Sequence, residues 1–294
     1  MTTLKDTLPI KRKRVLLAVT AHPDDETFGM GGTLALYASQ GVEVHLICAT
    51  RGELGEARAE YLKDYKSVAE MRMAELQCAA KTLGLAGVHL LNYRDSGMAN
   101  TPDNHHPRAL AAQPVEKVAD EIIHYIRLLK PQVVVTFDPI GGYHHPDHIA
   151  IHRATVNAFH AAGNARRGSG KPALPVWQPA KLYFHTMPNG YIRMAVKILP
   201  LFGKDPHKFG SNRDIDLTAI AANRFPTHAT IDTHHFTHVQ DEASACHASQ
   251  GGREMTSGLQ AWLSRLFRRK DTFMRDFPTP IAGERIESDL FQGL

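Results

Sequence analysis

Short apolar runs of strand length recur through the first half of the chain, separated by longer stretches of mixed polarity. They are "RVLLAVTA" (14–21), "VEVHLICAT" (42–50), "VHLLNY" (88–93) and "QVVVTFDP" (132–139). Continuous apolar runs of this length, rich in Val, Ile and Leu, are typical of strands that are buried on both faces of a parallel sheet. The pattern therefore predicts four parallel strands.

The stretches between these runs carry apolar residues at helical spacing. Residues 27–40 end at Gly41, a residue that commonly terminates helices. Residues 63–83 and 114–130 each have an apolar stripe that recurs every three or four positions. This alternation predicts an α/β fold, with a Rossmann-like, mostly parallel sheet of order 3-2-1-4-5 and helices on both faces.

The pattern weakens after about residue 160. We expect a single domain over residues 1–294, with its core at 14–160 and a smaller C-terminal α/β part at 161–294 that shapes the substrate site. Within that part the sequence predicts a surface loop at 163–175, a fifth strand at 181–187, a short helix or flap at 190–203, and the segment 229–233 followed by a helix at 236–250.

Composition and charge narrow the classes of protein. The chain has 294 residues, is 43% hydrophobic and carries a net charge of +4, with acidic and basic residues interspersed. This balance argues against a nucleic-acid partner. No apolar run reaches the ~18–20 residues that cross a bilayer, so we expect no membrane insertion. The composition leaves the oligomeric state open and allows a homo-oligomer.

The cysteines bear on the cellular compartment. Cys48, Cys78 and Cys246 lie far apart in the sequence and form no C-x-x-C motif. This predicts neither a structural disulfide nor a cysteine zinc cluster. Because we also find no signal peptide, the cytoplasm is the expected location.

The first predicted strand ends in an unusual cluster of polar residues, "TAHPDDETFGMGGT" (20–33). Leu34 stands where a dinucleotide-binding G-x-G-x-x-G motif would need glycine, so we exclude that site. Carboxylates packed this closely repel one another and resist burial. A divalent cation would offset the repulsion, with His22 and Asp25 facing one ion and Asp24 directed at a water on it.

The fourth predicted strand ends in a second cluster, "HHPDH" (144–148), which repeats the logic of "HPDD". Strands one and four are neighbours in a sheet of order 3-2-1-4-5, so their carboxyl ends flank the ligand crevice. His22, Asp25 and His148 would then form a two-histidine, one-carboxylate set with a position left for water. That pattern is typical of catalytic zinc, and it also suits iron(II) or another divalent metal.

Two further residues are ambiguous from the residues alone. Arg72 borders the apolar stripe of its predicted helix and could form an ion pair with Glu70 or Glu75, or contact a substrate. Asp95 follows the third predicted strand, where it could either form a turn or join the site.

Four motifs together resemble the LmbE/PIG-L N-deacetylases: "AHPDDE" (21–26), "EMRMAE" (70–75), "YRDSGM" (93–98) and "GGYHHPDH" (141–148). The match is close over residues 14–160 and looser beyond. This family includes enzymes that deacetylate N-acetylglucosaminyl inositol and N-acetylglucosaminyl malate in the synthesis of low-molecular-weight thiols.

The resemblance implies roles for the matching residues. It implies zinc bound by His22, Asp25 and His148, with Asp24 as the general base. His145 would stabilise the oxyanion or protonate the leaving amine, with Asp147 orienting it.

The resemblance also implies that Tyr143 touches the tetrahedral intermediate and that Arg72 and Asp95 hold the sugar or its appended group. At His144 the chain departs from the family pattern, where glycine is common.

These observations predict a zinc-dependent hydrolase that removes the acetyl group from an N-acetylglucosamine-containing small molecule, releasing acetate and a free amine. An amidase acting on thiol S-conjugates is the nearest alternative, with "YIRMAVKILPLF" (191–202) as a candidate apolar wall. A metal-binding protein without turnover is another, although it would not need the spare carboxylate of Asp24. A lectin-like sugar binder is a weaker alternative, because it would not need a metal-activated water.

Overall fold

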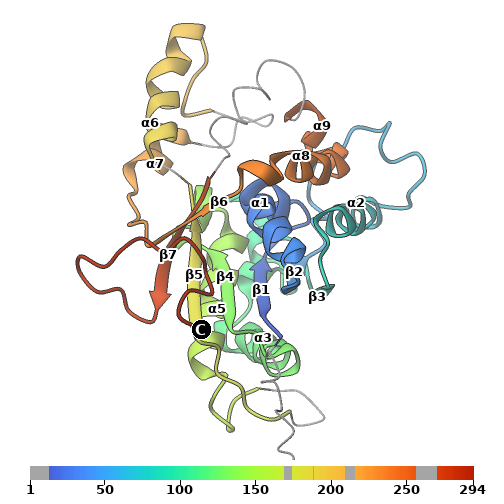
Figure 1. Ribbon diagram of the computed structural model, residues 1–294. Coiled ribbons are helices and arrows are strands. Elements are labelled where there is room, and N and C mark those ends of the chain that lie inside the picture. The colour runs from blue at the N-terminus through green and yellow to red at the C-terminus, as the bar shows by residue number, and fades with distance from the viewer. Residues whose placement is uncertain (1–12, 169–173, 188, 209–215, 256–269) are drawn as a thin grey trace, which may run out of the picture.

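The computed structural model describes residues 13–168, 174–187, 189–208, 216–255 and 270–294. Within these residues the strands form one seven-stranded sheet of order β3-β2-β1-β4-β5-β7-β6 (Figure 1). The strands are β1 (Val15–Thr20), β2 (Glu43–Thr50), β3 (Gly87–Tyr93), β4 (Val133–Phe137), β5 (Lys181–Thr186), β6 (Ala229–Asp232) and β7 (Lys270–Phe277).

The predicted strand order is confirmed for the first five strands. The β3–β2, β2–β1, β1–β4 and β4–β5 pairs are all parallel. β7 was not predicted: it lies between β5 and β6 and is antiparallel to both. Its residues alternate between buried and more exposed positions, so it lacks the continuous apolar run that marks the other strands. Through β7 the C-terminal part of the chain joins the same sheet.

Helices cover both faces of the sheet. The α-helices are α1 (Asp25–Ser39), α2 (Val68–Leu83), α3 (Val115–Leu129), α4 (Gly141–His144), α5 (Pro146–Ala161), α6 (Asn189–Ile198), α7 (Leu217–Ala222), α8 (Thr237–Cys246) and α9 (Gly252–Met255). Single 3₁₀ turns occur at Pro102–His105, Leu110–Ala112, Leu199–Phe202, His234–Phe236 and Ala248–Gln250.

The buried strand β1 divides the core in two. Leu16 and Ala18 pack on one face with side chains from α1, α2 and β7, while Leu17 and Val19 pack on the other with α3 and α5. Successive side chains of a strand point to opposite faces, so a strand buried on both sides must be apolar throughout. This is why the first predicted strand reads as an uninterrupted apolar run.

The helix starts differ from the predicted ones for local reasons. α1 begins at Asp25, two residues earlier than predicted, because the Asp24 carbonyl already accepts the Thr27 and Phe28 amides. α2 begins at Val68 rather than residue 63. Its cap is Ser67, whose hydroxyl accepts the Glu70 amide at 3.2 Å.

The predictions for the C-terminal part hold in outline. The segment 190–203 forms α6 and the 3₁₀ turn Leu199–Phe202, and the predicted helix at 236–250 becomes α8 and the turn Ala248–Gln250. Of the predicted loop, residues 169–173 lie outside the described residues. None of the helices in the described part of the chain is long and apolar enough to span a bilayer.

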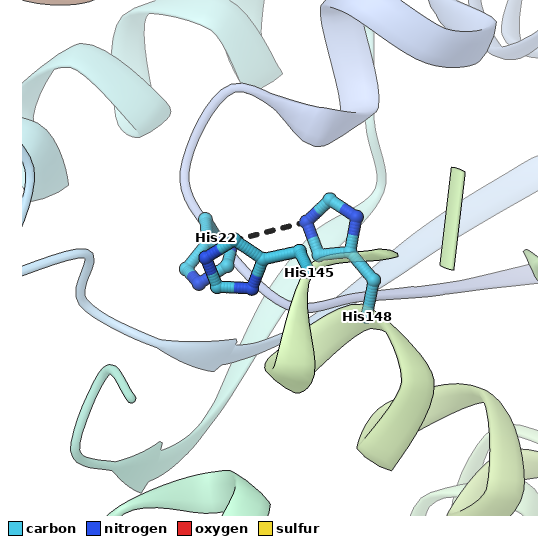
Figure 2. Close-up of side chains that lie close together, drawn as sticks. All are labelled: His22, His145 and His148. Atoms are coloured by element: carbon cyan, nitrogen blue, oxygen red, sulfur yellow. Dashed lines mark hydrogen bonds between the residues drawn. The ribbon is translucent and has the colours of Figure 1, made fainter. Parts of the chain in front are cut away.

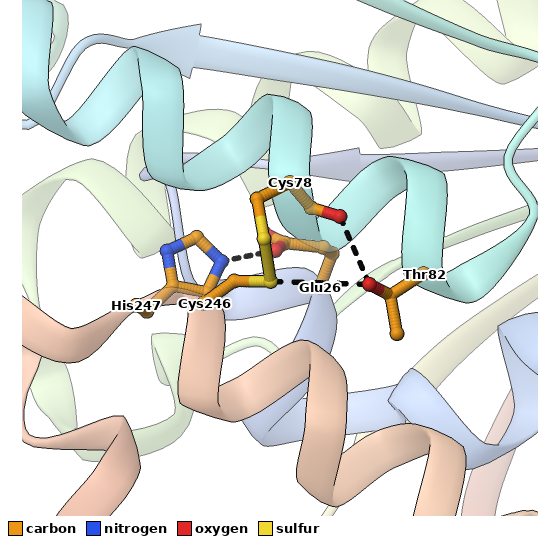
Figure 3. Close-up of a disulfide and its surroundings, with 5 residues drawn as sticks. All are labelled: Glu26, Cys78, Thr82, Cys246 and His247. Atoms are coloured by element: carbon orange, nitrogen blue, oxygen red, sulfur yellow. Dashed lines mark hydrogen bonds and ion pairs between the residues drawn. A yellow bond between two sulfur atoms is a disulfide. The ribbon is translucent and has the colours of Figure 1, made fainter.

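The cysteine prediction was wrong. Cys78 of α2 and Cys246 at the end of α8 form a disulfide, with their Cα atoms 5.8 Å apart (Figure 3). Cys48 is a buried free thiol. The two disulfide cysteines are 168 residues apart in sequence, and they meet because α2 packs against α8. Cysteine spacing could not reveal that contact. The predicted cytoplasmic location stays a prediction and loses the support it drew from the cysteines.

The disulfide should contribute measurably to stability. Closing so long a loop constrains the unfolded chain, and we expect Cys78→Ser to lower the free energy of unfolding by about 2–4 kcal/mol. The measurement is urea denaturation with and without reductant. Reductant should bring the wild type to the level of the variant and leave the variant unchanged. Equal midpoints for the oxidised wild type and the variant would contradict the expected contribution.

Candidate active site

The structure brings the nine predicted site residues to the carboxyl edge of the sheet. They come from four places: the β1–α1 junction, the β4–α5 junction, the segment after β3, and α2. The residues are His22, Asp24, Asp25, Arg72, Asp95, Tyr143, His145, Asp147 and His148. β1 and β4 are parallel neighbours, so the two His-Pro-Asp clusters face each other as the strand order predicts.

Three of these side chains converge on one point. The Nδ1 atom of His22 lies 3.2 Å from Nε2 of His148 (Figure 2). The same Nε2 atom lies 3.2 Å from Oδ1 of Asp25. Oδ2 of Asp25 is 3.7 Å from His22 Nδ1. Ligand atoms about 2.0–2.2 Å from a tetrahedral metal ion stand about 3.3–3.6 Å from one another, so the two 3.2 Å separations are close to those expected around a shared divalent ion.

The surroundings of His22 determine which of its nitrogens is free to bind. Its Nε2 lies 3.1 Å from Oδ2 of Asp147 and 3.6 Å from Oδ1 of Asp95. In the neutral ring the proton stands on Nε2, where it is donated to these carboxylates, and the lone pair is left on Nδ1. A carboxylate behind a ligating histidine is the usual arrangement in metal sites, because it orients the ring and increases its basicity.

The ring of His148 is likewise oriented by a hydrogen bond at one of its two nitrogens. Its Nδ1 lies 3.2 Å from the carbonyl oxygen of Gly141, so Nδ1 carries the proton and Nε2 faces Asp25 and His22. Phe137 stacks on the ring at 4.0 Å. Gly141 has a φ of 64°, and a Cβ there would come within 2.7 Å of the His148 Cβ. Glycine is thus needed for the backbone to approach this ring.

Two other groupings of side chains are close enough to hold an ion. One is His22, His145 and His148, and the other is His22, Asp95 and Asp147. The Nδ1 of His145 accepts the Asp147 amide at 3.2 Å, so its free nitrogen bears hydrogen. The Asp147 carboxylate accepts the amide and hydroxyl of Ser96 as well as the His22 ring. His145 and Asp147 are thus engaged by other groups of the protein, which distinguishes them from the His22, Asp25 and His148 atoms that face one another.

Asp24 stands beside this set and pairs with Arg72. Nη2 of Arg72 donates to Oδ2 of Asp24 at 3.0 Å and to the carbonyl of Pro23 at 2.5 Å, and Nη1 donates to the carbonyl of Gly52 at 3.0 Å. Among the described residues, the ion-pair partner of Arg72 is thus Asp24 rather than Glu70 or Glu75. A Cβ at Gly52 would come within 2.1 Å of the guanidinium, so this glycine makes room for Arg72.

His145, Tyr143 and Asp147 line the β4–α5 side. The Tyr143 ring meets the rings of His145 and His148 edge-on, at 5.7 and 5.1 Å. Asp147 orients His145 through its backbone amide, whereas its carboxylate holds His22. The predicted link between Asp147 and His145 therefore exists in a different form from the one the resemblance implied.

Asp95 is almost fully enclosed. Its Oδ1 accepts the Gly97 amide at 2.8 Å and its Oδ2 accepts the Leu54 amide at 3.4 Å, while Oδ1 also faces His22. Its contacts thus combine the two interpretations left open by the sequence, because it both forms a turn and joins the site.

The pKa shifts reflect this concentration of charge. Burial raises the pKa of Asp24 to about 6, against the opposing pull of Arg72. Burial would also raise the pKa of Asp25, but in the metal-free site positive charge on the His148 and His22 rings outweighs burial and holds that pKa well below its usual value. Burial lowers the pKa of His145 to about 2, so its ring is neutral. A neutral imidazole whose Nδ1 is an acceptor presents an N–H at Nε2.

Sequence reasoning missed three residues that support the site. Ser96 holds the Asp147 carboxylate, Glu26 accepts the Asp24 amide at 3.0 Å, and His247 contacts Glu26 at 2.6 Å. Ser96 and Glu26 lie within the family motifs at 93–98 and 21–26, so the sequence could have indicated their role in the site. His247 follows α8, far from the motifs, and carries no sequence signal of its own.

His144, the residue that departs from the family pattern, has a backbone conformation typical of glycine. His144 has a φ of 67°, in the left-handed region that glycine adopts without strain. The turn before α5 therefore accommodates a histidine in a conformation that costs about 1–2 kcal/mol for a residue with a side chain.

Comparisons with known proteins identify the family of this chain. A family model described as PIG-L, GlcNAc-PI de-N-acetylase, matches residues 17–159. The chain is 35% identical over 299 residues to 1D-myo-inositol 2-acetamido-2-deoxy-alpha-D-glucopyranoside deacetylase 2 of Catenulispora acidiphila, covering 96% of this chain and 97% of that relative. The chain belongs to the PIG-L family. The predicted class of enzyme, a deacetylase, is confirmed with it.

Other members and solved structures extend the comparison. The PIG-L chain is 43% identical over 212 residues to the 1D-myo-inositol 2-acetamido-2-deoxy-alpha-D-glucopyranoside deacetylase of Kineococcus radiotolerans, covering 67% of this chain and 58% of that relative. The N,N'-diacetylchitobiose deacetylase of Pyrococcus horikoshii has the same fold. The match has a TM-score of 0.62 at 20% identity and covers 91% of this chain and 85% of that structure.

Proposed function

We propose that this PIG-L protein is a zinc-dependent deacetylase that hydrolyses the N-acetyl group of an inositol-linked N-acetylglucosamine. The observation that carries the proposal is the convergence of His22 Nδ1, His148 Nε2 and the Asp25 carboxylate, with the separate carboxylate of Asp24 beside them. The names of the relatives in Catenulispora and Kineococcus support the choice of substrate.

The donor set fits zinc. Two neutral imidazoles and one carboxylate, each fixed by a hydrogen bond behind it, match catalytic zinc sites, which leave a position open for water or substrate. Bound there, zinc would supply Lewis acidity, lowering the pKa of a water toward ~7 and polarising the amide carbonyl. Iron(II) would suit the same donors, so metal analysis belongs in the first experiment.

Asp24 is the proposed general base. The Arg72 guanidinium fixes one of its oxygens, so the carboxylate has a defined direction rather than several rotamers. In this role it accepts the proton of the attacking water and passes it to the leaving nitrogen. The amine and acetate then separate.

His145 is the proposed oxyanion donor. Its ring is neutral and its Nδ1 is occupied by the Asp147 amide, so its Nε2–H is available to a developing negative charge. Tyr143, edge-on to the same ring, is the proposed second contact to the tetrahedral intermediate.

We propose that Arg72 and Asp95 influence the substrate indirectly, through the residues that they hold in place. Arg72 acts by holding Asp24, and Asp95 by holding His22 and the turn at Gly97. The proposed wall of the substrate site is the C-terminal part, residues 161–294. Its helix α7 packs against α4, which carries Tyr143.

A panel of substrates tests this proposal. Amine release would be measured for N-acetylglucosamine, its inositol and malate conjugates, N,N'-diacetylchitobiose and a bulky thiol S-conjugate amide. We expect the highest kcat/KM for the inositol conjugate, with turnover lost on chelation and restored by zinc. Preference for the S-conjugate amide would instead assign the protein as an amidase. Tight zinc binding without turnover of any member would overturn the deacetylase assignment.

A further inference from the structure

The backbone at Asp24 is held in an unusual conformation. Its φ is 126° and its ψ is −29°, a region that residues with a side chain rarely adopt. Such strain costs about 1–3 kcal/mol and persists only where the surroundings over-determine it. Arg72 binds the carboxylate of Asp24 and the carbonyl of Pro23, which leaves the Asp24 amide to be held by another group.

The group that meets this backbone is Glu26. Its Oε2 accepts the Asp24 amide at 3.0 Å, two residues back along the chain. Its Oε1 lies 2.6 Å from Nε2 of His247. Both side chains of this pair are fully buried. Glu26 therefore links the Asp24 amide to a histidine 221 positions away in sequence.

His247 is itself fixed against α2. It follows Cys246, whose disulfide to Cys78 ties the end of α8 to α2 (Figure 3). Two residues on, the amide and hydroxyl of Ser249 both donate to Glu75 of α2 at 2.8 Å. α2 also carries Arg72. The packed helices α2 and α8 thus support Asp24 at two points. Arg72 binds its carboxylate, and His247 acts through Glu26 on its amide.

Stability alone does not account for a buried pair of this kind. Removing a carboxylate and an imidazolium from water costs several kcal/mol per ion, and their attraction often no more than repays it. Glu26 also follows directly on Asp24 and Asp25, so without His247 it would add a third carboxylate to a crowded region. The buried Glu26–His247 pair is better explained by its hydrogen bond to the Asp24 amide.

We propose that Glu26 and His247 are positioning residues, which keep the Asp24 backbone in the conformation that presents its carboxylate to the reacting water. The inference rests on the proposed function, since it assumes that Asp24 is the base. Neither residue touches the substrate in this proposal. Both act through the Asp24 amide.

Alanine and conservative variants separate this role from a structural one. We expect Glu26→Ala and His247→Ala to lower kcat by about 10–100-fold, with KM and zinc content unchanged. Glu26→Gln and His247→Gln should retain most of kcat. In Glu26→Gln the carboxamide oxygen can still accept the Asp24 amide, and in His247→Gln the carboxamide nitrogen can still donate to Glu26. His247→Asn has a shorter side chain and should behave as His247→Ala does.

The matched control is Glu287→Gln. Glu287 forms a buried ion pair with Lys181 at 2.6 Å and with Arg275 at 2.9 Å, at the start of β5, away from the carboxyl edge of the sheet. This variant should lose stability as the Glu26 variants do and keep kcat. A kcat loss in Glu287→Gln as large as that in Glu26→Ala would attribute the effect to stability and overturn the proposal.

A second readout does not depend on activity. In metal-free protein, amide hydrogen exchange over residues 21–28 should be faster in Glu26→Ala and His247→Ala than in the wild type, and unchanged in Glu287→Gln. Unchanged exchange in the alanine variants would overturn the positioning role even if the wild type deacetylates no substrate. If the alanine variants do not fold, equal kcat in His247→Gln and His247→Asn would overturn it as well.

Discussion

Replacing Asp24 with asparagine should lower kcat by about 10²–10⁴-fold while the protein retains its zinc. Asparagine has the same shape and keeps an oxygen that can accept from Arg72, so the side chain should stay in place. It cannot take a proton from water. The loss therefore measures proton transfer rather than packing.

The measurement combines steady-state kinetics with metal analysis. KM should change little, because the introduced carboxamide keeps the position of the Asp24 carboxylate. Asp232→Asn is a suitable control, since Asp232 is an exposed carboxylate that pairs with His234 and its loss should not affect kcat. If Asp24→Asn emptied the metal site instead, Asp24 would be a ligand and the roles of Asp24 and Asp25 would have to be exchanged.

Removing His148 should abolish zinc binding and, with it, turnover. His148 Nε2 stands 3.2 Å from both His22 Nδ1 and Asp25 Oδ1, so alanine there removes one of the three converging donors. A ligand that binds only the folded protein raises the free energy of unfolding by about 4 kcal/mol at a concentration of 1,000 Kd. Zinc should therefore raise the thermal midpoint of the wild type and leave that of His148→Ala unchanged.

His152→Ala provides the matched control for this experiment. His152 lies one turn further along α5, is also buried, and directs its Nδ1 to the carbonyl of Phe137 at 2.8 Å, away from the three donors. Its loss should lower stability, but zinc should still raise the midpoint. A zinc-dependent rise in His148→Ala equal to that of the wild type would show that the metal is held by another set, such as His22, Asp95 and Asp147.

The sequence predicted only some of the contacts that hold the candidate site residues in place. Asp147 was expected to orient His145; its backbone amide does contact that ring, and its carboxylate in addition holds His22. Arg72 was expected to pair with a glutamate of its own helix or to contact a substrate, and it pairs with Asp24. The partner of Arg72 and the second partner of Asp147, His22, were therefore not predicted. Spacing along a helix or loop limits which side chains are local neighbours and says nothing of those arriving from another element.

The sequence by itself predicted the sheet order of the first five strands and the meeting of the two His-Pro-Asp clusters at the carboxyl edge of β1 and β4. These features follow from local patterns, because an apolar run specifies a buried strand and parallel strands bring their carboxyl ends to one edge. By contrast, which nitrogen of the His22 and His148 rings faces the other donors depends on Asp147 and on the Gly141 carbonyl. Only the folded chain places these two groups behind the rings.

The tertiary structure alone decided what α8 contributes. The Cys78–Cys246 disulfide and the contact of His247 with Glu26 both join residues more than 160 positions apart, and both depend on α8 packing against α1 and α2. No periodicity or motif spacing encodes such a contact, because it arises from the summed burial of apolar faces rather than from any local preference. For the same reason β7, with its alternating and partly polar residues, became a strand only through its pairing with β5 and β6.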